Sequence, residues 1–146
     1  MVLAMTQGSP ARAVSLVYVG NADSNEVVVL QLEQQTGDLT IIERVPIPDV
    51  IQPGISTPMA LSPDHRFLYV GVRGQPHAVS SFAINPANGR LTYLASAPLA
   101  DSMAYLVTDR TGRFLLGASY PGHKLSVNPI ELPGICLLYT SDAADE

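Results

Sequence analysis

The chain has 146 residues, 47% of them hydrophobic, and its thirteen Asp and Glu against eight Lys and Arg give a net charge of −5. This balance argues against nucleic-acid binding, which needs an excess of cations, and no run of 18 apolar residues is present that could span a membrane. The first residues lack the basic start and apolar run of a signal peptide, so we expect a cytoplasmic protein.

Ten β-strands are predicted along the chain. Each is a run of β-branched, aromatic or other apolar residues bounded by turn residues, as at 27–30 and 67–70. They are expected at residues 15–20, 26–33, 39–45, 58–62, 67–72, 78–84, 91–97, 104–108, 114–118 and 124–130. Residues 1–14 offer no strand, and no window has a sustained 3.6-residue apolar period, so helix should be nearly absent.

The strands belong to a repeating unit. The sequence YVG at 18–20 recurs 51 residues later, and the turn beginning at Gly37 recurs at Gly89 with an offset of 52. A third copy begins near residue 113. Periods of this size indicate a solenoid, a propeller or an array. Four short antiparallel strands in about 45 residues form the blade of a β-propeller, so the fold class is all-β.

The units are expected to be unequally complete. The middle unit has four predicted strands, between residues 58 and 97, whereas the first has three and the third ends after its third strand near residue 130. We therefore expect about two and a half four-stranded antiparallel blades. In a complete ring, a strand from the far end of the chain can fill the gap in the first blade.

The last eleven residues, CLLYTSDAADE at 136–146, depart from the repeat and carry the only cysteine. They resemble the in-frame translation of an adapter used in DNA sequencing libraries, so we expect the natural reading frame to leave this chain near Ile135. An ordinary acidic tail is the alternative. Without Asp142, Asp145 and Glu146 the net charge moves from −5 to −2, and without Cys136 the remaining segment excludes disulfides and cysteine-ligated zinc.

We therefore divide the chain into an N-terminal tail at 1–14, a partial propeller domain at 15–134 and an adapter-derived tail at 135–146.

The ordered motifs of the propeller segment resemble one known family. These motifs are YVGN with a downstream TGDLT, Gln52-Pro53 followed by TPMALSPDHRFLYVGVR, then NGRLT and ASYPGHKLSVNPI. Together they resemble the cytoplasmic β-propeller lactonases of the bacterial 6-phosphogluconolactonase family, over about residues 15–134. The resemblance implies a ring of seven blades, of which this chain would hold fewer than half.

Strand alternation sorts the loops onto two faces. The loops that follow the first and third strands of each blade are compact turns, and we interpret them as structural. The loops that follow the second and fourth strands are irregular and should form the mouth of a binding pocket. These loops lie at 21–26, 50–58, 73–78, 99–103 and 119–124.

Five residues of the irregular loops are candidates for substrate binding: Arg73, Gln52, His77, His123 and Lys124. Arginine and lysine suit an anionic substrate, and histidine is the natural base near neutral pH. Gln52 belongs to a motif that the resemblance supports. The alternatives are a solvated loop charge for Arg73 and Lys124 and an exposed loop histidine for His77 and His123.

Other conspicuous side chains are interpreted as structural. Arg66 and Arg113 recur beside a phenylalanine in successive blades, whereas a single central site needs no copy in each blade. The aromatic residues expected in the core between blades are Tyr18, Tyr69, Phe82 and Tyr93.

The resemblance implies hydrolysis of 6-phosphogluconolactone to 6-phosphogluconate, in the pentose phosphate pathway, by the complete protein. The partner would be a phosphorylated sugar lactone, with no nucleic acid, membrane, cofactor or metal ion, and the complete protein would be a monomer. The family's catalytic residues are expected in the middle blades, after Ile135, so no catalytic base is assigned and this fragment should be inactive. A muconate-lactonising propeller and a non-catalytic YV-repeat binding scaffold are the alternatives.

Overall fold

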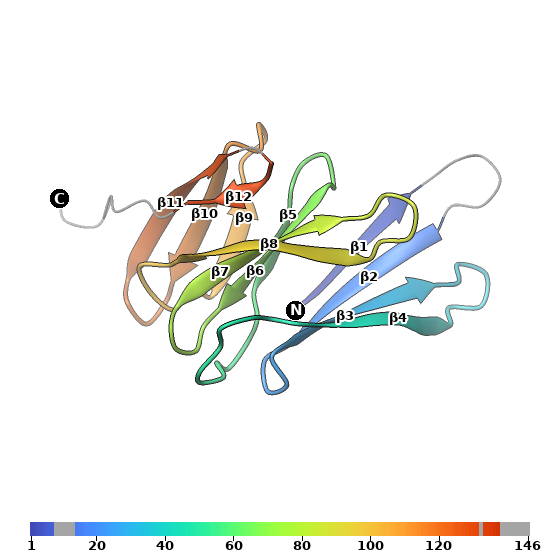
Figure 1. Cartoon of the computed structure of the whole chain (residues 1–146), viewed down its shortest axis with the longest axis horizontal. Coiled ribbons are helices and arrows are strands. Elements are labelled where there is room, and N and C mark those ends of the chain that lie inside the picture. The colour runs from blue at the N-terminus through green and yellow to red at the C-terminus, as the bar shows by residue number, and fades with distance from the viewer. Residues whose placement is uncertain (8–13, 132, 138–146) are drawn as a thin grey trace.

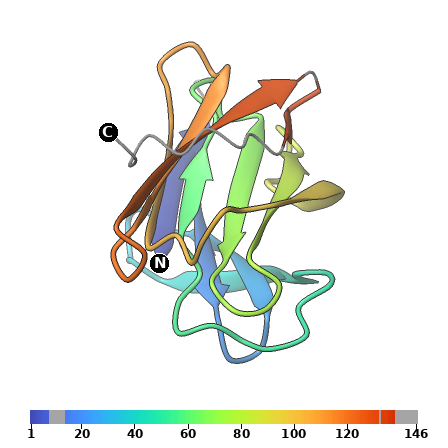
Figure 2. The same ribbon diagram turned by 90° about the vertical axis from the view of Figure 1, so that its left-hand side faces the viewer.

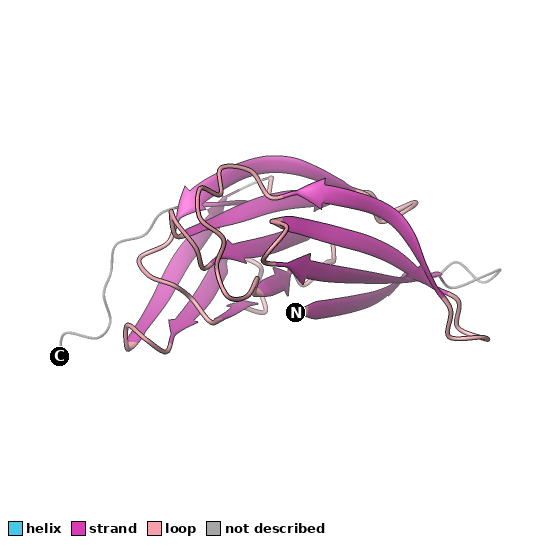
Figure 3. Cartoon of the chain, turned by 90° about the horizontal axis from the view of Figure 1, so that it is seen from below, coloured by secondary structure: helices cyan, strands magenta, loops and turns pink. Residues whose placement is uncertain are grey.

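The structure is a computed structural model that describes residues 1–7, 14–131 and 133–137 (Figure 1). These residues form three antiparallel four-stranded sheets, and no helix is found among them. Figure 3, coloured by secondary structure, shows the sheets as twisted layers joined by loops. The predicted all-β class and the blade architecture are therefore confirmed.

Each sheet contains its four strands in chain order. The first sheet consists of β1 (Val2–Gln7), β2 (Val14–Asn21), β3 (Glu26–Leu32) and β4 (Leu39–Pro46). The second consists of β5 (Met59–Leu61), β6 (Phe67–Val72), β7 (Ala78–Ile84) and β8 (Leu91–Pro98). The third consists of β9 (Tyr105–Thr108), β10 (Phe114–Ser119), β11 (Lys124–Glu131) and β12 (Ile135–Cys136). All ten predicted strands are present, with bounds that differ by one residue or none.

Two strands were not predicted, and both correct the expected count of two and a half blades. The expectation that residues 1–14 offer no strand is wrong for β1, which pairs with β2 from Val2↔Val19 to Gln7↔Val14. Residues 8–13 lie outside the described part. The third sheet does not end at its third strand, because β12 pairs with β11 through Glu131↔Ile135. All three sheets therefore have four strands.

The first strand of each sheet is the innermost. β5 lies against β1 on one side and against β9 on the other, while β12 lies against β7 and β8 of the preceding sheet. The three sheets are thus arranged around a common centre, as propeller blades are. The short strand β5 lies between β1 and β9 at this centre.

Buried apolar side chains fill the space between neighbouring sheets. Leu16, Tyr18 and Val29 of the first sheet belong to one cluster with Leu68 and Phe82 of the second. A second cluster joins the other side of the second sheet to the third; it includes Tyr69, Val79, Met103, Leu106 and Leu115.

The contact between the first two sheets is close at a turn glycine. The Tyr18 hydroxyl donates a hydrogen bond of 2.8 Å to the carbonyl oxygen of Gly89. Gly89 has a φ of 73°, and a Cβ there would overlap the side chain of Leu16. A residue other than glycine would therefore be strained in its backbone and would also force the sheets apart.

Three of the four aromatic residues expected in the core are buried there, namely Tyr18, Tyr69 and Phe82. Tyr93 is the exception, because 43% of it is exposed. It lies on the outer strand β8. Its ring packs edge-to-face on Phe82 with the centroids 5.8 Å apart.

The recurring arginine–phenylalanine pairs have the same arrangement in both sheets that carry them. The Arg66 guanidinium lies 5.7 Å from the ring centroid of Phe67, and that of Arg113 lies 5.8 Å from the centroid of Phe114. This repetition supports the structural interpretation.

Candidate functional site

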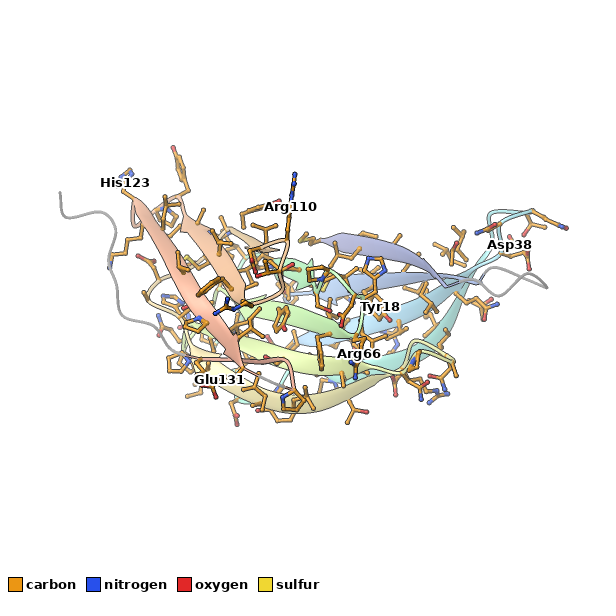
Figure 4. All side chains as sticks on the ribbon, turned by 90° about the horizontal axis from the view of Figure 1, so that it is seen from above. Tyr18, Asp38, Arg66, Arg110, His123 and Glu131 are labelled. Atoms are coloured by element: carbon orange, nitrogen blue, oxygen red, sulfur yellow. The ribbon has the colours of Figure 1, made fainter. Side chains whose placement is uncertain are left out.

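The irregular loops gather on one side of the molecule, which we call the loop face. It consists of residues 22–25, 47–58, 73–77, 99–104 and 120–123, which connect consecutive strands at the same ends of the sheets. Figure 2 shows these loops together at the lower end. The hairpin turns at 33–38, 62–66, 85–90 and 109–113 form the opposite side, the turn face. In Figure 4, His123 and Glu131 mark the two ends of β11, one toward each face.

Arg73 joins two segments of the loop face. It follows directly on β6 and is half-buried. Its Nη1 donates to Ser56 Oγ at 2.9 Å, and its Nε donates to Ser102 Oγ at 3.2 Å. Each serine lies in the loop that leads into an inner strand, Ser56 before β5 and Ser102 before β9. The guanidinium is thereby directed toward the centre around which the sheets are arranged.

Within the described residues, the Arg73 side chain forms no ion pair, so its charge has no counterion there. Its Nη2 atom also has no hydrogen-bond partner among these residues. The hydroxyl of Ser102 also donates to the carbonyl oxygen of Arg73, at 3.3 Å, and so fixes the start of the side chain. A guanidinium that two serines orient, that forms no ion pair among the described residues and whose Nη2 is open, is suited to binding an oxyanion.

Gln52 supports the Arg73 loop through its backbone. Gln52 and Gln75 form an isolated β-bridge in which each amide donates to the other's carbonyl at 3.0 Å. Gly54 and Gly74 allow this approach, because a Cβ on Gly74 would overlap the Gln52 carbonyl oxygen. The Gln52 residue itself is exposed. The structure therefore brings Gln52 to the candidate site as a backbone brace for the segment that carries Arg73.

His77 lies beside Gln75, with 3.5 Å between its Nε2 and the Gln75 Nε2. Its Nδ1 is buried and lacks a hydrogen-bond partner in the described structure. The residue lines a separate hollow of about 220 Å³ together with Asp49 and Ser96. His77 is thus on the loop face, but toward the outer strands and away from the serines that hold Arg73.

His123 and Lys124 belong to the third sheet. His123 is exposed, has a φ of 52°, and its ring centroid lies 6.5 Å from that of Tyr120. Lys124 is half-buried at the start of β11, opposite Ser119. The serines around Arg73 belong to other loops, those before β5 and β9, so the structure does not gather the five predicted candidates into one cluster.

Glu26, a carboxylate of the same face, already has its partners. Its Oε1 lies 2.7 Å from Nη1 of Arg44 and accepts from Asn21 Nδ2 at 3.3 Å. Burial acts to raise the pKa of Glu26, but the hydrogen bonds from Asn21 and Ser24 and the charge of Arg44 outweigh it and lower that pKa. The carboxylate therefore stays ionised and paired.

Sequence reasoning missed Ser56 and Ser102. Serine is common in loops, so neither residue stood out in a single sequence. The sequence signal that could have identified these two serines is their shared position in the repeat, because both lie shortly before the first strand of a sheet. Only the fold shows that Arg73 reaches both of them.

Among the described residues, no group of three or more His, Cys, Asp or Glu side chains is placed to hold a metal ion. No helix of that part of the chain has the length and apolar character to cross a bilayer.

Comparison with known proteins identifies the family. The family described as "Lactonase, 7-bladed beta-propeller" matches residues 17–141. The chain belongs to the seven-bladed β-propeller lactonases. The resemblance seen in the sequence motifs is thereby confirmed, and the lactonase match includes the first residues of the tail that begins at 135.

Curated lactonase relatives are named 6-phosphogluconolactonase. The one from Enterobacter sp. (strain 638) is 40% identical over 115 residues, which is 79% of this chain and 33% of that protein. The one from Yersinia pestis (strain Pestoides F) is 41% identical over 119 residues, or 82% of this chain and 33% of that protein. The chain thus spans about one third of the length of these relatives.

Solved structures support the lactonase fold. The periplasmic gluconolactonase of Pseudomonas aeruginosa matches with a TM-score of 0.76 and 21% identity, over 97% of this chain and 38% of that one. A protein from Lactobacillus plantarum matches with a TM-score of 0.71 and 23% identity, over 94% and 40%.

Proposed function

We propose that the complete protein, of which this lactonase chain would be the N-terminal part, hydrolyses 6-phosphogluconolactone to 6-phosphogluconate in the pentose phosphate pathway. The relatives that bear this enzyme name are about 40% identical to the chain. The structural observation that carries the proposal is Arg73, a half-buried guanidinium without a counterion among the described residues.

In this proposal Arg73 binds the phosphate of the substrate. Its Nε and Nη1 are held by Ser102 and Ser56, which leaves Nη2 to meet an oxyanion without further ordering of the side chain. Gln52 braces the loop, while His77, His123 and Lys124 contribute to the wider mouth. Lactone hydrolysis also requires a base that activates water and donors that stabilise the developing oxyanion. We assign these roles to the remaining blades.

The proposal also covers the location, the oligomeric state and the partners of the protein. We infer a cytoplasmic monomer that acts on a phosphorylated sugar lactone, without a nucleic-acid or membrane partner. We also infer that residues 135–146 derive from an adapter. Sequencing the source DNA across the Ile135 codon tests this inference, because a natural frame that encodes CLLYTSDAADE would contradict it.

The decisive experiment compares two lactones on the completed protein. Arg73→Ala should raise the KM for 6-phosphogluconolactone about tenfold or more, since a hydrogen bond to a charged group contributes about 1.5–3 kcal/mol. The same variant should change the KM for unphosphorylated gluconolactone much less. Arg110→Ala, on the turn face, is the matched control and should change neither value. An equal effect of Arg73→Ala on both lactones would contradict phosphate binding, and absence of lactonase activity from the completed protein would contradict the function.

A further inference from the structure

A second hollow lies on the turn face, on the side of the molecule opposite Arg73. It has a volume of about 470 Å³ and lies between the second and third sheets. Its walls include Phe67 and Tyr69 of β6, Ile130 of β11 and the turn residues around Asp64 and Thr111. This volume is within the range of small-molecule sites.

Tyr69 lines this hollow and has a hydroxyl group available for hydrogen bonding. The residue is 1% exposed, and its hydroxyl has no hydrogen-bond partner in the described structure. The hydroxyl oxygen is not itself fully shielded, since His77 Nδ1 is the one fully buried unpaired side-chain nitrogen or oxygen in the described structure, so it can donate to a molecule in the hollow. Burial, together with Cys136 and Asp64, raises the pKa of Tyr69, so the group remains a hydrogen-bond donor.

Tyr18 is the matched residue one sheet earlier, and it is satisfied. Its hydroxyl donates to the carbonyl of Gly89, whose equivalent at the next interface is Gly134. Both glycines have positive φ, and both lie against the residue two positions before the tyrosine, Leu16 and Phe67 respectively. The Tyr69 hydroxyl nevertheless forms no hydrogen bond to Gly134. Both residues line the hollow instead.

The charges around the hollow are balanced. The Asp64 carboxylate is fixed by Ser62 Oγ at 2.6 Å and by the backbone amide of Arg66 at 3.1 Å. Arg113, also in the wall, carries the opposite charge and lies over Phe114. With one charge of each sign and mostly apolar walls, the hollow suits a neutral molecule better than an anion.

We propose that this hollow is a second binding site, which takes a small, neutral, largely apolar molecule whose hydrogen-bond acceptor receives the Tyr69 hydroxyl. The site is independent of the phosphate-binding role of Arg73, since the two lie on opposite faces.

Acetophenone is a suitable probe, because it combines an aromatic ring with one carbonyl acceptor. Its binding to the full chain is measured by saturation-transfer NMR, which tolerates self-association of the protein. Tyr69→Phe removes only the donor and should weaken binding about three- to tenfold, as expected for one hydrogen bond. Tyr18→Phe should leave the affinity unchanged, because Tyr18 does not line the hollow.

Two further variants identify where the probe binds. Arg73→Ala should have no effect, which separates this site from the proposed substrate site. Leu125→Asp alters an exposed leucine on the outer surface of the third sheet and should also have no effect. Equal affinity of the Tyr69→Phe variant, absence of binding, or loss of binding in Leu125→Asp would each overturn the proposal.

Discussion

Tyr18 and Tyr69 show how far equivalent residues of a repeat can differ. The YVG motif places both in the second strand of a sheet, and both side chains are buried. Tyr18 completes its interface with a hydrogen bond to Gly89, whereas Tyr69 does not have this bond. The YVG motif therefore determines where the tyrosine ring lies. The turn of the neighbouring sheet determines whether the hydroxyl has a hydrogen-bond acceptor.

This difference predicts unequal stability effects. Tyr18→Phe should lower the free energy of unfolding by about 0.5–1.5 kcal/mol, because it leaves the buried Gly89 carbonyl without its donor. Tyr69→Phe should be near neutral, since no hydrogen bond is lost. Urea denaturation of both variants measures the effects, and equal losses would contradict the assignment of hydrogen bonds.

From the hydrogen bonds of Asp109 we predict that the turn at 109–113 loses stability in acid. Its carboxylate accepts from the Thr111 hydroxyl and from the backbone amides of Thr111, Arg113 and Phe114. The Thr111 hydroxyl, followed by these amides, lowers the pKa of Asp109 from 3.8 to about 2. Because the folded-state pKa is depressed, the stabilisation is present above about pH 3.8 and is lost as the pH falls toward about 2.

The test compares Asp109→Asn with the wild-type chain during acid titration. The wild-type protein should lose its stability advantage over the variant between about pH 4 and pH 2. A difference that stays constant over this range would show that protonation of Asp109 is not responsible.

The candidate site was only partly predictable from individual residues. Arg73 could be identified because a cation directly after an apolar strand, in an irregular loop, is unusual. Ser56 and Ser102 could not, since their importance comes from a three-dimensional approach across loops about 46 residues apart in the sequence. His77 and His123 were chosen for their chemistry alone, and the structure places them in separate surroundings.

At the scale of elements, the loop face depends on close backbone packing. The segment from Gln52 to Gly54 lies directly on Arg73 and Gly74, so there is no room for a Cβ at either glycine. This packing keeps Arg73 in reach of Ser56, which lies just beyond the same segment.

Gly74→Ala should therefore disrupt the loop face. The new methyl group would overlap the Gln52 carbonyl, break the bridge to Gln75 and displace Arg73. We expect a destabilisation of about 1–3 kcal/mol, typical of overpacking, and loss of amide protection at Gln52 and Gln75 in hydrogen exchange. Gln75→Ala is the matched control, because it keeps both backbone bonds. Retained protection in Gly74→Ala would contradict this role of the glycine.

The elements that sequence reasoning found and missed differ in physical ways. The ten predicted strands are runs of β-branched, aromatic or other apolar residues bounded by turn residues. β1 has the sequence VLAMTQ, in which Ala, Met and Gln carry little strand preference, so its conformation comes from pairing with β2. β12 has only two residues and is defined by the register of β11, which no local pattern can reveal.

At the scale of the whole molecule, the third sheet has one face without a neighbour. It presents a continuous row of exposed apolar side chains, namely Tyr105, Val107, Phe114, Leu116, Leu125 and Val127. The register β9–β10–β11 places Val107, Leu116 and Val127 directly side by side. The first sheet likewise exposes Leu39 and Ile41. Apolar patches of this kind favour association.

The chain alone should therefore self-associate. Sedimentation velocity at micromolar concentration should detect species larger than the monomer, and Leu125→Asp, at a residue 62% exposed, should reduce them. Ala100→Asp, in an exposed loop, adds the same charge elsewhere and should not. A monomer at all concentrations, or an equal response to both variants, would show that the exposed sheet face does not drive association.

The contact between Tyr18 and Gly89 also bears on how such a chain can change over generations. The first two units each present a tyrosine strand to a turn glycine of the unit that follows, so the two boundaries in the described structure use the same two kinds of surface in the same sense. A duplicated stretch of one period would arrive with both surfaces already fitted to its neighbours. Gain or loss of whole units is therefore open to this lineage through a single recombination event, whereas a change of half a unit would bring two unmatched surfaces together.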